Sequence, residues 1–474
     1  YAAGDAGFDT VYGGAGIESY VYGGTGIDGV DAGAGDDGYV YGGDGDDTVE
    51  AGDGNDYFVY GGAGNDSVYG GAGYESLVWG DAGDDTIGGG GGNDDVRGDV
   101  GQDVYIYNRG DGQDFLHDYE AGSYGTGVDR ILFGAGITAA ELAFQQYGND
   151  LYIGLPTDQE RADGVEARLM ADRVQLYYWN QGDGNYQIER LAFAEPGEAE
   201  MDQAAILARL GSEANDSIRG DLLVEGLGLD LTLSGYGGDD DLRGAEGDDT
   251  LSGGSGNNHL YGGAGEDTFV FNRGDGWNYI HDYEAGSYGT GVDKILFGAG
   301  ITADQLVFQH YSDDLIIALP AEDGSEAGVE PRLMANRFYL ENWMNADGNY
   351  QIERLVFTEP GEAEMDQAAI LARLGSEANN STRGDLLVEG LGLDLTLSGY
   401  GGHDDLRGAE GDDSLYGGAG NGSYVYGGAG NDRVYGGAGH DGYVYGGDGD
   451  DIVDSGADND SYVYGGAGDD TVEA

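Results

Sequence analysis

The sequence predicts an all-β protein in which segments of a parallel β-roll (a β-solenoid) are interrupted by two small duplicated modules, rich in strands and of α+β character. Three observations carry this prediction. A nine-residue motif with phased glycines and aspartates recurs toward both ends of the chain, and a different segment of about a hundred residues occurs twice. Gly makes up 98 of the 474 residues without a three-residue period. That much Gly alone would suggest disorder, but the nine-residue period overturns this interpretation.

The charge balance excludes several classes of function. The chain has 91 Asp and Glu residues against 19 Lys and Arg, a formal net charge of -72. Phosphate backbones and anionic lipid surfaces would repel it, so nucleic-acid binding and direct membrane insertion are not expected. No apolar run approaches the roughly 18 residues that cross a bilayer. Cys is absent, so disulfides and thiolate metal sites make no contribution.

From Gly4 onward, the first hundred residues divide into units of the form Gly-Gly-x-Gly-x-Asp-x-U-x, where U is a large apolar residue; residues 42–50 and 61–69 show it clearly. Glycines allow a tight turn with positive φ, and x-U-x is a short strand with one inward side chain. Two units make one turn of a flattened coil. The acid at position six therefore recurs once per turn, in files with a spacing of about 4.8 Å.

These files of acids predict bound calcium. Two like charges at that spacing repel by about 1 kcal/mol in water, and several times more where water is partly excluded. Ca²⁺ takes about six to eight oxygen ligands, carbonyls included, and suits a flexible loop better than Mg²⁺. We therefore expect multiple ions and an ion-free chain expanded by its own charge. The predicted ligands are Asp9, Asp28, Asp37, Asp47, Asp56, Asp66, Asp85, Asp94, Asp240, Asp249, Asp267, Asp404, Asp413, Asp432, Asp441, Asp451, Asp460 and Asp470.

Some positions depart from the pattern. Asp46 and Asp84 at position five are interpreted as solvated surface charge. Weaker or empty units are expected where position six is lengthened to Glu or carries no charge. These positions are Glu18, Glu75, Asn258 and Gly422.

The nonapeptide resembles the repeats-in-toxin (RTX) calcium-binding repeat, a signature of the parallel β-roll. The strings NRGDGQDFLHDYE, VDRILFGAGITAAEL and YQIERLAFAEP resemble the haemolysin-type calcium-binding related domain, which accompanies such repeats in secreted bacterial proteins. The resemblance implies type I secretion.

An alternation of unit length goes beyond this pattern. Most turns contain 19 residues, and the extra residue always falls in the same half-turn. In these longer half-turns a triplet with Val between two residues, nearly all of them aromatic, follows the ligand. If the inward residue comes two positions after the ligand, as in the nine-residue units, the first aromatic lies inside. If the extra residue forms a bulge, Val lies inside and both aromatics lie outside. We favour the bulge, since a roll with single Val residues in its core is too thin for paired phenols. Outward aromatics would favour self-association into a filament or lattice, while inward ones would be core packing alone. The triplets are residues 20–22, 39–41, 58–60, 77–79, 424–426, 443–445 and 462–464.

The second segment recurs with a constant offset of 164 residues, from about 103–251 to 267–415. We interpret each copy as a spacer or cap that covers the open end of a roll. Strands are predicted at 130–133, 150–153, 174–177 and 188–193, capping boxes at Thr138 and Thr302, and a longer helix over 198–210. The predicted domains are an N-terminal roll (1–102), module 1 (103–210), a short degenerate roll (211–266), module 2 (267–374) and a C-terminal roll (375–474).

No catalytic site is predicted. His117 and His281 precede Asp118 and Asp282, but neither G-x-S-x-G nor H-E-x-x-H accompanies them, so structural histidines are expected. The first functional hypothesis is a secreted, extracellular or cell-surface structural protein that folds on export into calcium-rich medium and forms filament, matrix, surface-layer or adhesin material. The alternative is a calcium-triggered folding and secretion region of a type I secreted enzyme or toxin. In either case we expect a piece of a longer array.

Overall fold

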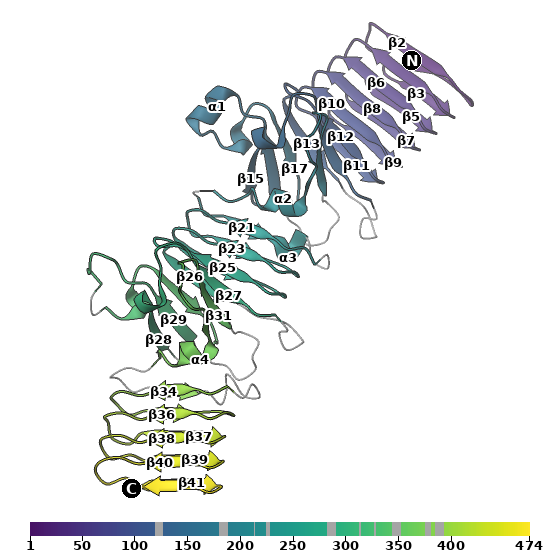
Figure 1. Cartoon of the computed structure of the whole chain (residues 1–474). Coiled ribbons are helices and arrows are strands. Elements are labelled where there is room, and N and C mark those ends of the chain that lie inside the picture. The colour runs from purple at the N-terminus through teal and green to yellow at the C-terminus, as the bar shows by residue number, and fades with distance from the viewer. Residues whose placement is uncertain are drawn as a thin grey trace. The chain divides into compact units, whose positions relative to one another are not determined.

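The computed structural model describes residues 1–118, 127–179, 188–212, 214–223, 228–281, 291–311, 314–326, 329–343, 352–374, 381–383 and 393–474. Its described elements are overwhelmingly strands, stacked turn upon turn within each roll (Figure 1). The predicted all-β parallel β-roll is confirmed. One compact unit holds residues 1–211, the second holds residues 227–474, and residues 212–226 are divided between them. No helix in the described part of the chain is long and apolar enough to span a membrane.

The first unit is built from two sheets whose strands alternate along the chain. Parallel pairing joins residues 19 apart, as in Val21 with Val40 and Val30 with Val49. One sheet contains, in order, β1 (Ala2–Ala3), β3 (Val21–Thr25), β5 (Tyr39–Asp44), β7 (Phe58–Ala63), β9 (Val78–Ala82), β11 (Asp95–Val100), β13 (Gln113–His117), β17 (Arg173–Leu176), β16 (Asp150–Gly154) and β15 (Ala143–Tyr147). The other contains β19 (Met201–Asp202), β18 (Arg190–Phe193), β14 (Arg130–Phe133), β12 (Val104–Tyr107), β10 (Thr86–Gly91), β8 (Ser67–Ala72), β6 (Thr48–Asp53), β4 (Gly29–Gly33) and β2 (Thr10–Gly14).

The second unit repeats this construction in four sheets. The seven-stranded sheet is β20 (Ser217–Arg219), β22 (Asp241–Arg243), β24 (Asn257–Tyr261), β26 (Trp277–His281), β30 (Arg337–Leu340), β29 (Asp314–Ala318) and β28 (Val307–Tyr311). The six-stranded sheet is β21 (Thr232–Ser234), β23 (Thr250–Ser252), β25 (Thr268–Phe271), β27 (Lys294–Phe297), β31 (Arg354–Phe357) and β32 (Met365–Asp366). The five-stranded sheets are β33 (Ser381–Arg383), β35 (Asp405–Arg407), β37 (Tyr424–Ala429), β39 (Tyr443–Asp448) and β41 (Tyr462–Ala467), and β34 (Thr396–Ser398), β36 (Ser414–Tyr416), β38 (Arg433–Tyr435), β40 (Ile452–Asp454) and β42 (Thr471–Glu473).

The core of each roll is a thin layer of aliphatic side chains between the two sheets. Val11, Val30 and Val49 point inward from one sheet of the first unit, and Val21 and Val40 point inward from the other. In the ten-residue units the buried Val follows position six by three residues rather than two, so the extra residue is taken up before the strand. The predicted orientation, Val inside and the aromatics outside, is confirmed: Tyr20 and Tyr39 are exposed.

The modules continue the same ladders before they end them. Strands β12 and β13 pair in parallel with β10 and β11, so pairing runs through residue 103 without a break. Antiparallel pairing follows, between β16 and β17 and between β18 and β19. The short helices are α1 (Asp158–Asp163), α2 (Gln203–Leu207), α3 (Gly220–Leu223), α4 (Gln367–Leu371), and the 3-10 turns η1 (Ala139–Glu141), η2 (Ala167–Leu169), η3 (Ala303–Gln305) and η4 (Pro331–Leu333).

The predicted local elements of the modules are found with one exception. The strands at 130–133, 150–153, 174–177 and 188–193 correspond to β14, β16, β17 and β18, and both capping boxes are present on single 3-10 turns. The helix predicted over 198–210 is wrong in extent. Met201 pairs with Leu191 as part of a strand, and the Asp202 side chain then caps α2 by accepting from the amide of Ala205 at 2.9 Å. Helix α2 therefore covers five residues.

Substitution of one turn glycine tests why the glycines are phased. Gly45 has φ +133°, and a Cβ there would overlap the carbonyl oxygen of Gly26 in the preceding turn. We expect Gly45→Ala to lower the free energy of unfolding by about 2 kcal/mol or more. Urea denaturation in saturating calcium measures the change. Gly29→Ala is the control, since its nearest neighbour would lie 3.9 Å away; a change of more than about 0.5 kcal/mol there would contradict the explanation.

Candidate metal sites

The position-six carboxylates form the predicted files, and most of them accept a hydrogen bond from a backbone amide of a neighbouring turn. The amide of Asp28 donates to Oδ1 of Asp47 at 2.7 Å, and the amide of Asp47 donates to Oδ1 of Asp66 at 2.7 Å. The same bond recurs down both half-turns of the first unit and in the second. All the predicted ligands take part in such files: Asp9, Asp28, Asp47, Asp66 and Asp85; Asp37, Asp56 and Asp94; Asp240; Asp249 and Asp267; Asp404; Asp413, Asp432, Asp451 and Asp470; Asp441 and Asp460.

The second oxygen of most of these carboxylates is buried and accepts no hydrogen bond. A buried carboxylate oxygen without a partner is costly, and a cation removes that cost. Glu75 is fully buried with both oxygens in this state. The Oδ2 atoms concerned are those of Asp28, Asp37, Asp47, Asp56, Asp66, Asp85, Asp94, Asp240, Asp432, Asp441 and Asp451, and Oδ2 of Asp103, which was not predicted, is in the same state.

Oxygens of two neighbouring turns converge beside the first glycine of many units. A Cβ built on Gly42 would lie 2.7 Å from Oδ2 of Asp47 and 2.7 Å from the carbonyl oxygen of Gly61, one turn further on. Carboxylate and carbonyl oxygens from two turns thus converge beside this glycine. Hard oxygens in this mixture are the donors that Ca²⁺ takes, so the residues fit the predicted ion.

The pKa values of the carboxylates in the files also favour a bound cation. Burial raises the pKa of Asp66 to about 7, and the neighbouring charges that act on it are the carboxylates of Asp47, Asp46 and Asp81. Burial likewise raises the pKa of Asp85 to about 7, with the Asp66 charge adding to the effect. Without an ion, these groups hold protons near neutral pH, and a bound cation would displace them.

Not every predicted ligand offers an open oxygen. Oδ2 of Asp249 accepts from the amide of Ala245 at 2.8 Å, and Oδ2 of Asp413 accepts from the amide of Ala409 at 2.9 Å. Units with an open Oδ2 have positive φ at position two, as at Gly43 (128°), which turns that amide away. The backbone of an Ala at position two therefore takes the place that an ion would fill.

The two units without a carboxylate at position six, those of Asn258 and Gly422, carry neutral groups there. Nδ2 of Asn258 donates to the carbonyl oxygen of Gly254 at 3.0 Å and to Oδ1 of Asn278 at 2.9 Å, so an amide nitrogen replaces the open oxygen. In the unit of Gly422, the buried Ser423 hydroxyl accepts from the amide of Asp404 at 3.5 Å. These contacts explain how a file passes through a unit without a carboxylate.

Sequence reasoning missed four acids of the first module. Asp103 and Asp129 continue one file, because the amide of Asp85 donates to Oδ1 of Asp103 and the amide of Asp103 donates to Oδ1 of Asp129. Asp114 continues the other file beyond Asp94. The 164-residue offset is a signal that would have found Asp103, since its counterpart Asp267 was predicted. Asp118 lies outside the nonapeptide phase, and no spacing rule points to it.

The histidines do not form the dyad considered from the sequence. His117 lies on the outer face of β13, stacked on Tyr177 with ring centroids 4.3 Å apart, while Asp118 is buried. Burial lowers the pKa of His117. Successive strand residues face opposite sides of a sheet, so the two side chains cannot act together. His281 contacts Glu341 through Nδ1 at 2.6 Å, and Asp282 lies outside the described residues.

Comparison with known proteins identifies the repeats. The family described as the RTX calcium-binding nonapeptide repeat matches residues 1–16, 22–58, 41–74, 77–105, 234–269, 243–277, 398–421, 426–462 and 445–474. The chain is therefore an RTX repeat protein, a calcium-binding parallel β-roll. Residues 106–233 and 278–397 lie outside these matches, so the resemblance of the modules to the haemolysin-type related domain stays a prediction.

Two individual proteins are similar to parts of the chain. The iron-regulated protein FrpA of Neisseria meningitidis serogroup C is 35% identical over 130 residues, which are 26% of this chain and 10% of that protein. The match thus spans about a tenth of that relative. The crystal structure of the extracellular lipase LipA from Serratia marcescens matches 65% of this chain and 43% of its own, at 18% identity and a TM-score of 0.20. This likeness carries no argument about function.

The raised pKa values predict a pH-dependent calcium requirement. In the ion-free roll, protonated carboxylates contribute stability that is fully present below about pH 4 and is lost as the pH rises through about 7. Calcium binds the deprotonated form, so the half-saturating concentration should fall between about pH 6 and pH 8 and level off above. Circular dichroism during calcium titrations at several pH values measures it. A midpoint independent of pH would contradict the role of these carboxylates.

Two neighbouring rungs of the C-terminal roll give a matched test of the open oxygen. Asp432→Asn should remove one calcium ion per chain, because its Oδ2 has no other partner. Asp413→Asn should leave the ion count unchanged and cost about 1 kcal/mol of stability through the lost bond to Ala409. Metal analysis after equilibrium dialysis counts the ions. Equal ion loss in both variants would show that an amide does not substitute for the ion.

Proposed function

We propose that this chain is a secreted bacterial structural protein: a calcium-stabilised β-solenoid that becomes rigid outside the cell and associates with further copies through aromatic faces, as filament, matrix, surface-layer or adhesin material. The observation that carries this proposal is a ladder of outward aromatic side chains on one sheet of each terminal roll.

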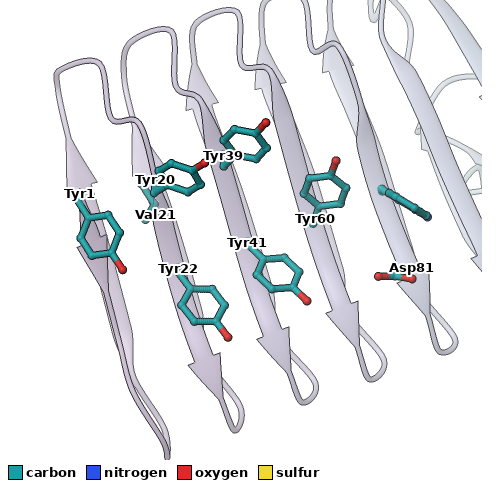
Figure 2. Close-up of a pocket in the computed structure, with 9 residues that line it drawn as sticks. Tyr1, Tyr20, Val21, Tyr22, Tyr39, Tyr41, Tyr60 and Asp81 are labelled. Carbon is teal, nitrogen blue, oxygen red and sulfur yellow. The ribbon is translucent and has the colours of Figure 1, made fainter.

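The N-terminal aromatic strip runs across β3, β5, β7 and β9. Tyr20 and Tyr39 stack with ring centroids 4.8 Å apart, and Tyr22 and Tyr41 stack at 5.3 Å. Figure 2 shows these rings in two rows along successive strands. A shallow groove of about 490 Å³ lies over them. The strip consists of Tyr20, Tyr22, Tyr39, Tyr41, Phe58, Tyr60 and Trp79.

The C-terminal aromatic strip repeats the arrangement on β37, β39 and β41. Tyr443 and Tyr462 stack with ring centroids 4.5 Å apart, and Tyr424 and Tyr443 stack at 5.6 Å. Tyr462 and Tyr464 are about half exposed. The strip consists of Tyr424, Tyr426, Tyr443, Tyr445, Tyr462 and Tyr464.

These strips suit contact between copies of this chain. Tyr combines a large apolar ring with a hydrogen-bonding hydroxyl, and exposed contiguous aromatics mark interaction surfaces. Both strips have the strand spacing of the roll, so a strip on one copy matches the period of a strip on another. The net charge of -72 opposes association until calcium neutralises part of it, which makes assembly depend on the ion.

An extracellular site of action follows from the calcium requirement. RTX repeat proteins are generally secreted. Extracellular calcium modules bind at roughly 0.1 to 1 mM, a level that the cytosol does not reach. The chain would therefore stay expanded until export and fold outside. No catalytic role is proposed for it.

Paired substitutions on opposite sheets test the self-association. Tyr39→Ser with Tyr41→Ser removes the centre of the N-terminal strip, and Tyr12→Ser with Tyr69→Ser makes the same change on the opposite sheet. In about 5 mM calcium, sedimentation velocity should show assembly of the wild type and the control, and association of the strip variant weakened about tenfold or more. A wild type that folds with calcium yet stays monomeric at high concentration would overturn the proposal in favour of a folding and secretion region.

A further inference from the structure

We propose that Asp103, Asp118 and Asp129 form a calcium site of their own at the junction of the N-terminal roll and the first module, with three carboxylates where an ordinary rung offers one. This junction site does not depend on self-association, and it would stand if the aromatic strips bound nothing.

The three carboxylates converge in the interior of the protein. One oxygen from each lies within 4.8 Å of an oxygen of the other two, and all three side chains are nearly inaccessible to solvent. They come from three different places in the sequence: Asp103 precedes β12, Asp118 follows β13, and Asp129 precedes β14. The roll brings them together because β12 pairs in parallel with β14.

Asp118 stands where the repeat normally has its first glycine. The pairing of Arg97 with His117 places Asp118 beside Gly98, the first residue of the unit that contains Asp103. In the ordinary rungs, a carbonyl oxygen of a glycine from the next turn lies at this point, as Gly61 does beside Gly42. At the junction, the Tyr105 hydroxyl lies near this point instead, and it donates to the carboxylate of Asp118.

One oxygen of this cluster has no other partner. Oδ2 of Asp103 is buried and accepts no hydrogen bond, and a Cβ on Gly98 would collide with it. Asp103 as a whole is 0% exposed, so water does not reach this oxygen from the surface. The open oxygen therefore points into the cluster and marks the place of a ligand.

The remaining hydrogen bonds hold the carboxylates in place. The Tyr105 hydroxyl donates to Oδ1 of Asp118 at 2.7 Å, and the amide of Asp103 donates to Oδ1 of Asp129 at 2.6 Å. The amide of Asp129 donates in turn to Oε2 of Glu189, which directly precedes β18. These bonds orient the group before an ion arrives, which lowers the cost of binding.

Three negative charges make this site stronger than an ordinary rung. Calcium affinity rises with the number of charged ligands and with the rigidity of the site. The junction site should therefore fill at lower calcium concentration than the rest of the file. Its ion would join the last nonapeptide turn to the module. Calcium-dependent folding of the roll would then start from this junction.

Asp118→Asn tests the site, with Glu50→Gln as a charge-matched control on the exposed face of β6. In equilibrium dialysis against a calcium series, the wild type and the control should show one tight ion that the Asp118 variant lacks. The duplicated module carries the same acids in sequence at Asp267, Asp282 and Asp293, so the expected effect is the loss of one tight ion per chain rather than a shift of the first binding step. The β content of the variant in saturating calcium should match the wild type. An unchanged number of tight ions would overturn the proposal.

A crystal of the wild-type protein grown with terbium in place of calcium gives a test that does not rely on a variant folding. Anomalous density in contact with Asp103, Asp118 and Asp129 is the expected result. Density confined to the ordinary rungs, with none at the junction, would overturn the junction site and leave the calcium-binding roll intact.

Discussion

The interaction on which the structure depends is the stacking of one buried carboxylate on the next along each file. Each carboxylate accepts the amide of a neighbouring rung through one oxygen, and this bond fixes its second oxygen in the interior. Asp47 shows the pattern, with Oδ1 bonded to the amide of Asp28 and Oδ2 left open. The hydrogen bond thus holds the carboxylate in the interior, where its negative charge and its unpartnered oxygen are costly. A divalent ion bound to that oxygen removes the cost and leaves the hydrogen bond in place.

Because ions and turns hold the rungs together, the strands need little core. A single inward Val per half-turn is enough, as at Val40 and Val49. The side chains on the outer faces of the sheets are therefore not needed to form the core. The aromatic strips occupy one such face. Their rings stack at the strand spacing because the backbone places them there, so calcium binding at the turns and the shape of the aromatic surface are consequences of the same period.

Features that follow the repeat period could be predicted from the sequence, whereas features that depend on local backbone conformation or on strand pairing could not. The period placed Asp66 in a file, and the extra residue before Val40 placed that side chain inside. Asp249 satisfies the same pattern, but its open oxygen is lost because Ala245 lacks the positive φ that turns the amide away. Asp118 was not predicted because it does not follow the nine-residue pattern. Only the pairing of β11 with β13 places it near Asp103.

The size of the core differs between rungs of the C-terminal roll. The rung of Asp432, which has an open oxygen, has Val434 inside, although larger side chains also accompany open oxygens elsewhere, as Leu242 accompanies Asp240. Where a backbone amide satisfies the carboxylate instead, as at Asp413, the inward residue is Leu415. Each additional buried CH₂ is worth about 0.8 kcal/mol, so the larger core stabilises a rung that gains less from an ion. The degenerate repeats have Leu inside at 233, 242, 251 and 260, and we expect this larger core to make them less dependent on calcium than the terminal rolls that carry the aromatic strips.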